Sequence, residues 1–538
     1  MILSFVTSGG TVLSQSEVRY DDLGRVTAKS TGNGGEEALF WEYYGYQHKM
    51  GQKTTNQLRS IQVQGEGFQK EYAYTYDTMG NIASIATENG QTRYFYDSLN
   101  QLTRVDDAAQ NKTVTYSYDN GGNILSVQEY AYTNGELTGS AAVTKTYVYD
   151  ANWKDKLASF DGKAITYDQI GNPISYDGWA YTWEAGRQLK SLSKAGVSIA
   201  YKYDDTGFRT QKTVNGTTTD YLVLENRILQ QSDGTNTITF RYDGENKAAS
   251  FDLNGTEYYY LRNLQGDIAG IVDGTGSLVV EYAYDAWGKL LSITGSLADT
   301  VGVLNPLRYR GYYYDTETGL YYLQSRYYNP EWGRFINADA AAILQLAAQS
   351  DYVLSTNLFS YCMNNPVMNY DPTGYVSMGA IIGGIIGFGV GAILIPAIAD
   401  SWGLKGWKRN VFIIGGVAAV TAIGALLGHY AGKALVSLYA KGGAFAKQLN
   451  TAVAKVIGKF TKASVTSAKG NGWILKLKNY TVRIMSEGGG RTNYFRISHA
   501  TKGAMTIAGA FSGNRALTHI PITVDSLFKL IKMMLRWK

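Results

Sequence analysis

The side chains best suited to catalysis lie in the last hundred residues of the chain. A pair of histidines can act as general base and general acid, and arginines can hold a phosphate and stabilise the charge that develops on it. Each histidine by itself also fits the simpler role of an ordinary, partly buried residue. The candidates for this acid–base and phosphate chemistry are His519, His499, Arg515, Arg491, Arg496 and Arg483.

The charge of this region limits the chemistry. Residues 440–538 carry 12 Lys and 5 Arg but only Glu487 and Asp525 as acids, so their net charge is +15 while residues 1–439 carry −10. Two acids cannot build a carboxylate-rich magnesium site, and two histidines without cysteine cannot build a three-histidine zinc centre. We therefore expect no metal and no other cofactor. The pattern predicts metal-independent cleavage of RNA, whose 2′-hydroxyl is the nucleophile, by a domain that binds polyanions.

The elements that must position these side chains form a small α+β domain. Residues 441–464 have apolar residues at helical spacing, and residues 524–538 predict a closing helix. The runs between them are rich in β-favouring residues. These predicted strands lie within 472–486, 491–500, 504–511 and 516–523.

Two uncharged stretches, residues 376–399 and 411–428, precede this domain. Each is close to the ~20 residues that a membrane-spanning helix needs. Their many glycines allow helices to pack closely in lipid. We expect a glycine-rich helical hairpin over 376–439, which either enters a target-cell membrane or packs inside the protein.

Residues 20–290 repeat one dipeptide, Tyr-Asp, usually followed by a glycine and a strand-like run. Three copies, at Asp77, Asp97 and Asp119, are spaced 20 and 22 residues apart. A period of this length with a turn in each unit predicts stacked β-hairpins, since one hairpin cannot bury its apolar face alone. We expect the aspartates to form the turns and the tyrosine rings to pack between strands while their hydroxyls reach solvent or the backbone. The other copies are Tyr20–Asp21, Tyr167–Asp168, Tyr203–Asp204, Tyr242–Asp243 and Tyr284–Asp285.

A tyrosine-rich stretch, PLRYRGYYYDTETGLYYLQSRYYNPEWGRFINADA, ends the repeats at residues 306–340. Its aromatic clusters, punctuated by turn formers, predict short strands joined by tight loops. A helix is expected at 340–349, before the NPVMNYDPTG ending at Gly374. Together with the repeats, this stretch resembles the core of the rearrangement-hotspot (RHS) and tyrosine-aspartate (YD) repeat family.

The resemblance implies a mainly β fold, a coiled β-sheet shell of YD-repeat hairpins closed by a core plug, with divergent cargo behind it. It divides the chain into a shell at 1–300, a plug at 301–375, the hydrophobic helical segments at 376–439 and the basic domain at 440–538. It also implies aspartyl self-cleavage after DPTG, near Tyr375, with Asp339 as a catalytic carboxylate and Arg326 as its partner. An aspartyl mechanism needs two carboxyls. Where the family has aspartate this chain has Asn329, so the sequence names no second one.

We expect a polymorphic-toxin-like protein whose shell encloses a C-terminal ribonuclease that acts in the cytoplasm of a competing cell. RNA is then the substrate, a cognate immunity protein is the expected partner, and the target-cell membrane is contacted through 376–428. The start of the chain has no basic region of a secretory signal. We therefore expect it to be the C-terminal piece of a longer secreted or cell-surface protein. Two alternatives remain open: a pore-former acting through 376–428, and a surface adhesion protein without catalysis.

Overall fold

The computed structural model describes two compact units, residues 1–425 and 426–538, which we treat separately. The helices expected at 340–349, 376–399, 411–428, 441–464 and 524–538, and the expected boundary at 439, lie outside the described residues, apart from Ser464. Described are residues 2–339 except 9–10, 24, 35–36, 50–52, 225–226 and 244–246; then 353–375, 464–468, 472–477, 480–485, 494–501, 503–505 and 520–521.

The first unit is built on one antiparallel sheet of 27 strands. Each strand pairs with the next strand in the chain, as expected for successive hairpins. The first strands are β1 (Ile2–Ser8), β2 (Thr11–Tyr20), β3 (Val26–Thr31), β4 (Phe40–Lys49), β5 (Lys53–Gly65), β6 (Phe68–Tyr76), β7 (Ile82–Thr87), β8 (Gly90–Tyr96), β9 (Leu102–Asp107), β10 (Lys112–Tyr118), β11 (Ile124–Ala131), β12 (Val143–Tyr149), β13 (Leu157–Phe160) and β14 (Lys163–Tyr167). The others are β15 (Pro173–Tyr176), β16 (Trp179–Glu184), β17 (Gln188–Lys194), β18 (Val197–Tyr203), β19 (Arg209–Val214), β20 (Thr217–Leu224), β21 (Arg227–Ser232), β22 (Thr237–Tyr242), β23 (Ala248–Leu253), β24 (Thr256–Arg262), β25 (Ile268–Asp273), β26 (Leu278–Tyr284) and β27 (Leu290–Thr294).

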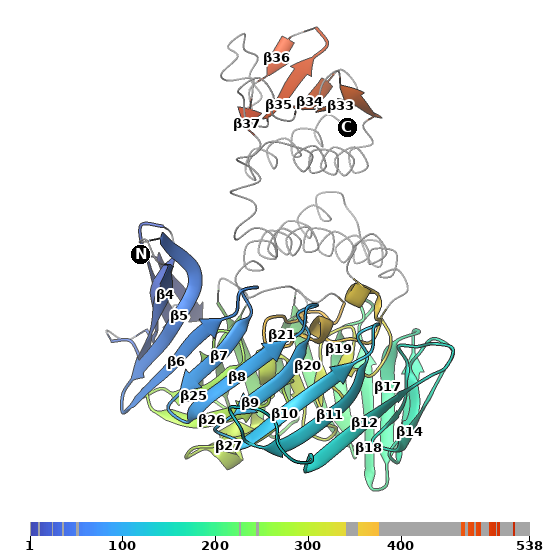
Figure 1. The fold of residues 1–538 in the computed structure, drawn as a ribbon. Helices are drawn as coiled ribbons and strands as arrows, with labels where there is room; N and C mark the ends of the chain where they lie inside the picture. The colour runs from blue at the N-terminus through green and yellow to red at the C-terminus, as the bar shows by residue number, and fades with distance from the viewer. Residues whose placement is uncertain are drawn as a thin grey trace. The chain divides into compact units, whose positions relative to one another are not determined.

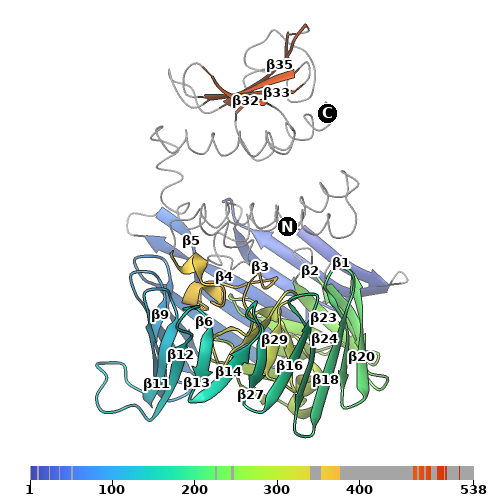
Figure 2. The same cartoon turned by 90° about the vertical axis from the view of Figure 1, so that its right-hand side faces the viewer.

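This sheet coils until its early strands reach its late ones (Figures 1 and 2). Lys70 on β6 forms an ion pair with Glu281 on β26 at 2.5 Å. Likewise, Lys29 on β3 lies 3.5 Å from Asp243, which follows β22. The mainly β, coiled-shell fold implied by the family resemblance is therefore confirmed.

The Tyr-Asp dipeptide makes a hairpin turn through its carboxylate, as the Asp77 repeat shows. At Asp77, one carboxylate oxygen accepts hydrogen bonds from the backbone N–H groups of Met79 and Asn81 at 2.9 and 2.8 Å. The other accepts from the Asn81 side-chain amide at 2.9 Å. Gly80 supplies the positive φ of +93° that closes the turn. The aspartates are thus turn formers, as the sequence predicts.

The tyrosines of several repeats tie one strand of the wall to the strand before it. Their rings pack against the core, and each hydroxyl donates to a carbonyl at the start of the preceding strand, which satisfies a backbone acceptor as well as the phenol. The bonds run from Tyr96 to Ile82, Tyr149 to Ile124, Tyr203 to Leu189 and Tyr242 to Ile228, each at 2.8 Å, and from Tyr284 to Ile268 at 3.0 Å.

The described residues between 298 and 375 form a tyrosine-rich core inside the coil (Figure 2). Fully buried Arg209 on the wall pairs with buried Asp315 of this core at 2.6 Å. Tyr321 and Tyr328 are completely buried and donate their hydroxyls to backbone carbonyls of the 284–290 turn. The elements are η1 (Ala298–Gly302), η2 (Tyr309–Gly311), β28 (Tyr313–Asp315), β29 (Leu320–Tyr322), β30 (Tyr327–Asn329), β31 (Arg334–Phe335), η3 (Val353–Thr356) and η4 (Cys362–Asn364); β28 to β31 form a four-stranded sheet.

The second unit contains a six-stranded sheet. The run at 472–486 forms two strands instead of one, and a strand at 464–468 was not predicted. No helix within the described residues of either unit is long and apolar enough to cross a bilayer. The strands are β32 (Ser464–Ala468), β33 (Gly472–Leu477), β34 (Tyr480–Met485), β35 (Tyr494–His499), β36 (Gly503–Met505) and β37 (Ile520–Pro521).

Candidate functional site

A buried polar cluster of the first unit surrounds Arg326, which directly precedes β30. Its side chain is buried, and its Nη2 atom lies 3.0 Å from Oδ2 of Asp339 and 3.6 Å from Oδ2 of Asp371. The face of its guanidinium covers the Phe335 ring at 3.5 Å. The structure therefore brings together the two residues that the sequence proposed for self-cleavage, and it adds a second carboxylate.

Asp371 also shapes the DPTG turn itself. Its Oδ1 atom accepts hydrogen bonds from the backbone N–H groups of Thr373 and Gly374 at 3.2 and 2.8 Å. Its own N–H donates to the hydroxyl of buried Tyr312 at 2.8 Å. One oxygen of this carboxylate is thus committed to the turn, while the other faces Arg326.

The carbonyl of Gly374 is held against the same arginine. Arg326 Nε donates to the Gly374 carbonyl oxygen, and Ser325 donates to the carbonyl of Thr373 from both its Oγ, at 2.7 Å, and its backbone N–H, at 3.2 Å. Gly374 has a φ of +75°, and a Cβ there would meet the Leu323 carbonyl oxygen at 2.7 Å. Only glycine fits this close approach.

Asn329 does not belong to this cluster. Its side-chain oxygen accepts from the backbone N–H groups of Glu331 and Trp332 at 2.9 and 3.3 Å, so it caps a turn. An amide does this as well as a carboxylate. The second carboxylate that sequence reasoning sought at 329 is supplied 42 residues later by Asp371, and the DPTG motif was the signal that could have found it.

Two further groups border the Arg326 cluster. Arg187 Nη1 donates to the carbonyl of Ala338 at 2.5 Å, next to Asp339, and burial lowers the pKa of this arginine. Burial raises the pKa of the Tyr375 phenol, and the nearby Asp339 carboxylate raises it further. Residues on both sides of the expected cut are therefore enclosed with the two acids and Arg326.

In the second unit, one sheet face is cationic. Arg483 on β34 and Arg496 on β35 stand directly opposite each other across the strand pair, and both are exposed. Exposed Lys476 lies beside them, in register with Thr481. Like charges directly opposite destabilise a strand pair, so this arrangement favours an anionic partner.

The other face of this sheet is apolar: Val482 is 1% exposed and Ile497 is fully buried. Successive residues of a strand point to opposite faces, so His499 shares the side of Ile497 and not that of Arg496. His499 Nδ1 accepts a 3.3 Å hydrogen bond from the backbone of Thr501. The other candidates, His519, Arg515 and Arg491, lie outside the described residues.

Residues 91–367 match the family model described as Teneurin YD-shell. The chain belongs to the teneurin YD-shell family. Among its relatives is the tRNA3(Ser)-specific nuclease WapA of Bacillus spizizenii, 36% identical over 287 residues, which are 52% of this chain and 12% of that protein. The toxin protein Tse5 of Pseudomonas aeruginosa is 24% identical over 390 residues, or 59% of this YD-shell chain and 28% of Tse5.

A solved structure also resembles this YD-shell chain. The crystal structure of TcdB2-TccC3-Cdc42 gives a TM-score of 0.48 at 19% identity, covering 69% of this chain and 21% of that one. The chain thus spans only a small part of the length of the WapA and TcdB2-TccC3 proteins that it matches.

Proposed function

We propose that this YD-shell protein is a toxin that cuts its own chain after Gly374 and thereby frees a C-terminal effector, a metal-independent ribonuclease. The observation that carries the first step is the Gly374 carbonyl held by Arg326, whose guanidinium also contacts Asp339 and Asp371. The relatives named as a tRNA nuclease and as a toxin support the class of activity.

The self-cleavage is a hydrolysis of the Gly374–Tyr375 peptide bond. One carboxylate removes a proton from water as its oxygen attacks the Gly374 carbonyl, while the other carboxyl, in its protonated form, donates a proton. Arg326 stabilises the negative charge that develops on the carbonyl oxygen. Collapse of the intermediate gives a new carboxylate on Gly374 and a free amino group on Tyr375.

The effector step rests on the basic domain. Its net charge of +15 and the exposed pair of Arg483 and Arg496 favour a polyanion. In this proposal His519 and His499 transfer protons, and Arg515, Arg491 and Arg496 bind the phosphate. RNA is the substrate, a cognate immunity protein protects the producer, and a longer secreted or surface protein delivers the effector to the target-cell cytoplasm.

Self-cleavage is tested on the full chain by denaturing electrophoresis and intact-mass measurement. The parent is expected to give two fragments that meet between residues 374 and 375, and Asp339→Asn or Asp371→Asn is expected to stay intact. Asp233→Asn, in an exposed hairpin turn, is the matched control and should be cut normally. An uncut parent, or full cutting by the Asp371→Asn protein, would contradict the proposed pair.

The ribonuclease is tested by inducing the full chain inside bacteria and following growth and total RNA. The parent should arrest growth and fragment RNA, whereas His519→Ala and Arg515→Ala should accumulate as folded protein with intact RNA. Intact RNA with the parent, with the cut fragment present, would refute the ribonuclease and leave the cleavage proposal standing.

A further inference from the structure

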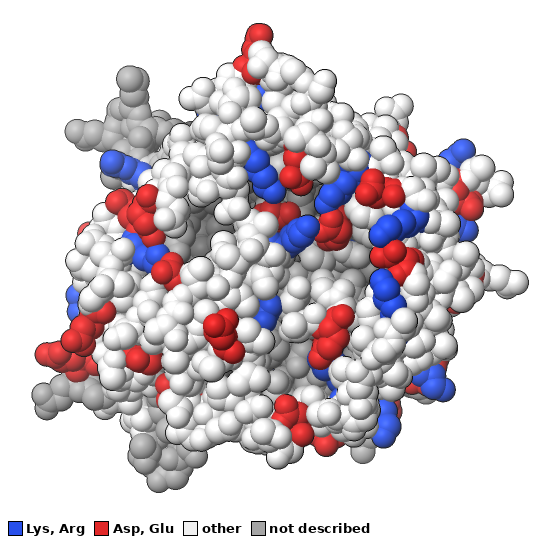
Figure 3. Space-filling view, turned by 90° about the horizontal axis from the view of Figure 1, so that it is seen from below, with Lys and Arg blue, Asp and Glu red and all other residues white. Residues whose placement is uncertain are grey.

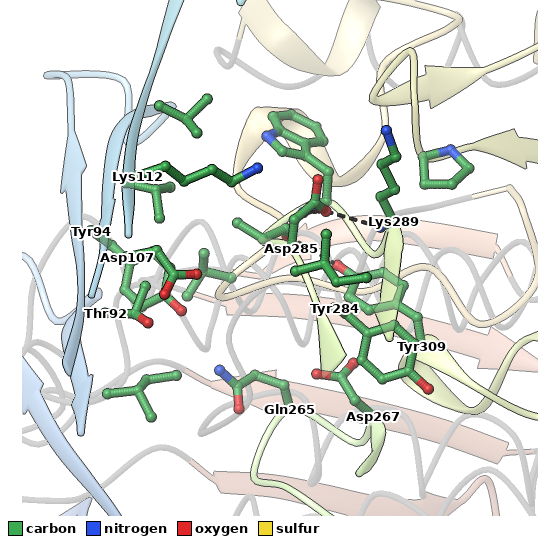
Figure 4. Close-up of a pocket in the computed structure, with 18 of the residues that line it drawn as sticks. Thr92, Tyr94, Asp107, Lys112, Gln265, Asp267, Tyr284, Asp285, Lys289 and Tyr309 are labelled. Atoms are coloured by element: carbon green, nitrogen blue, oxygen red, sulfur yellow. Dashed lines mark hydrogen bonds between the residues drawn. The ribbon is translucent and has the colours of Figure 1, made fainter. Parts of the chain in front are cut away.

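A cavity of about 300 Å³ lies within the first unit, between the wall formed by β7 to β11 and the strands β25 to β27. Figure 4 shows Lys112 and Asp107 entering it from the first wall and Asp285 and Gln265 from the second. Seen from below, the unit is hollowed, and acidic and basic side chains alternate around the hollow (Figure 3). Tyr309 and Glu331 of the core also line the cavity.

Most cations of the cavity already have acidic partners. Lys70 is held by Glu88 at 2.6 Å and by Glu281 at 2.5 Å. Lys145 and Lys289 share Glu331, the latter at 2.6 Å. Lys112 and Arg310 lie within 3.7 and 3.6 Å of Glu129 and Asp267, respectively.

Two carboxylates of the lining are left with an open oxygen. Asp285 Oδ1 accepts from the backbone N–H groups of Trp287 and Lys289, both at 2.9 Å, and Oδ2 has no hydrogen-bond partner in the described structure. Asp107 Oδ1 accepts from the backbone N–H of Gln110 at 3.1 Å, and its Oδ2 accepts no hydrogen bond from the described residues. Burial raises the pKa of Asp285 to about 6, so the carboxylate is charged at neutral pH.

A third acceptor opens toward the same space. The side-chain oxygen of Gln265 is buried and has no hydrogen-bond partner among the described residues. A buried acceptor without a partner is costly. Together with Asp107 and Asp285, it makes a set of acceptors that a ligand rich in donors would satisfy.

Aromatic rings complete the lining. Tyr94, Tyr116, Tyr284 and Tyr309 all border the cavity, and a tyrosine face attracts a cation within about 6 Å. The pKa of Tyr94 is raised by burial first and then by the charges of Asp107, Asp267 and Asp285, which places these carboxylates around one ring. Rings of this kind also pack against methylene groups.

We propose that this cavity binds a small organic cation with two amino groups, of the diamine or polyamine class. One ammonium donates to Asp107 on β9 and the other to Asp285 after β26, with Gln265 as a third acceptor and the tyrosine rings against the carbon chain. A cavity of about 300 Å³ has the volume of roughly ten water molecules, which suits such a chain. A bare metal ion fits less well, since no three His, Cys, Asp or Glu side chains in the described part of the chain are placed to share one.

The ligand would join two walls of the cavity that are distant in sequence. Binding to the folded state alone raises the melting temperature of the shell in proportion to the logarithm of ligand concentration. Ligand binding by the shell is independent of the proposed cleavage and ribonuclease activities.

The test uses the full chain at pH 7.5, with 1,4-diaminobutane and spermidine as probes, in isothermal titration calorimetry and thermal unfolding. We expect saturable binding with one site per chain, at least tenfold weaker binding of butylamine, and no effect of sodium chloride at equal ionic strength. Asp285→Asn and Asp107→Asn should each weaken diamine binding at least tenfold. Asp204→Asn, at the same turn position of a repeat that does not line the cavity, should bind like the parent.

The proposal fails if neither diamine binds saturably, if butylamine binds as tightly as the diamines, or if Asp285→Asn binds like the parent. Asp285→Asn keeps the turn acceptor for Trp287 and Lys289, so it folds and decides the question even if Asp107→Asn does not fold. A maltose titration tests the other ligand class that tyrosine-lined sites accept, and preferential maltose binding would overturn the assignment to a cation.

Discussion

Replacing Asp285 with asparagine is expected to stabilise the shell at neutral pH. Asparagine retains the oxygen that accepts from the Trp287 and Lys289 backbone, so the turn is preserved. The charge is lost, and with it the cost of holding a carboxylate in a buried place. The groups that face Asp285 are Lys112 on β10 and Lys289 before β27, which lower its pKa less than burial raises it, and the neutral phenol of Tyr116.

The size of the effect follows from the pKa of this carboxyl. Burial raises it from 3.8 to about 6, and each unit corresponds to about 1.4 kcal/mol. The folded state therefore holds this proton more tightly than the unfolded state does, so the contribution of Asp285 to stability is greatest below pH 3.8 and falls as the pH rises to about 6. Above that pH the loss amounts to about 2–3 kcal/mol, which the asparagine variant does not suffer.

Hydrogen exchange of peptides covering residues 278–294 measures this locally, between pH 4.5 and 7.5 and without added amines. The variant should be better protected than the parent at pH 7.5, and the difference should shrink toward pH 4.5. Asp97→Asn is the control, because the second oxygen of Asp97 bonds the Gln101 side chain at 2.7 Å and its replacement gives no gain. Equal or poorer protection of the Asp285 variant at pH 7.5 would refute the reasoning.

Three other changes test the wall, the core and the junction. Tyr96→Phe removes the 2.8 Å hydrogen bond to the Ile82 carbonyl and should lower the free energy of unfolding by about 1 kcal/mol. The loss should appear as faster hydrogen exchange in β7 and β8, and exchange at the parent rate would show that this bond does not stabilise the strand pair. Arg209→Met leaves buried Asp315 with Lys212 at 3.3 Å and the Tyr201 hydroxyl at 3.4 Å as its remaining side-chain partners. The loss of about 3 kcal/mol should appear as a lower melting temperature, and an unchanged value would show that the ion pair does not stabilise the fold. Gly374→Ala places a Cβ 2.7 Å from the Leu323 carbonyl oxygen and should therefore slow self-cleavage, measured as a time course on folded protein. Cutting at the parent rate would show that the close packing around Gly374 does not position the cleaved bond.

The sequence was sufficient for the parts of the fold that depend on local chemistry. Asp77 followed by Gly80 predicts a turn because the interactions of both lie within one loop. For Tyr96, the sequence predicts that the hydroxyl reaches solvent or the backbone, but it does not identify the Ile82 carbonyl as the acceptor. That partner depends on the stagger between successive strands. The repeat pattern therefore predicts the hairpins of the wall, whereas the register between successive hairpins is known only from the structure.

The candidate sites were less accessible to sequence reasoning, because they join distant residues. Asp339 and Arg326 were proposed from a resemblance, and Asp371 was overlooked because its approach to Arg326 depends on the path of the core between them. The opposite faces of Arg496 and His499 follow from strand alternation once β35 is assigned. The cavity around Asp285 could not be predicted, since Asp107 lies on a wall formed 178 residues earlier in the chain.

Because every strand of the wall pairs with its successor in the chain, the wall can fold in order from its N-terminal end. A hairpin of the wall can form as soon as it leaves the ribosome or a secretion channel, because its partner is already present. The core is different: the side chain of Asn365 bonds that of Asn81 at 3.2 Å across 284 residues of sequence. We therefore expect the wall to fold first and the core to pack against it afterwards. The complete shell then forms only once the residues just before Gly374 have emerged.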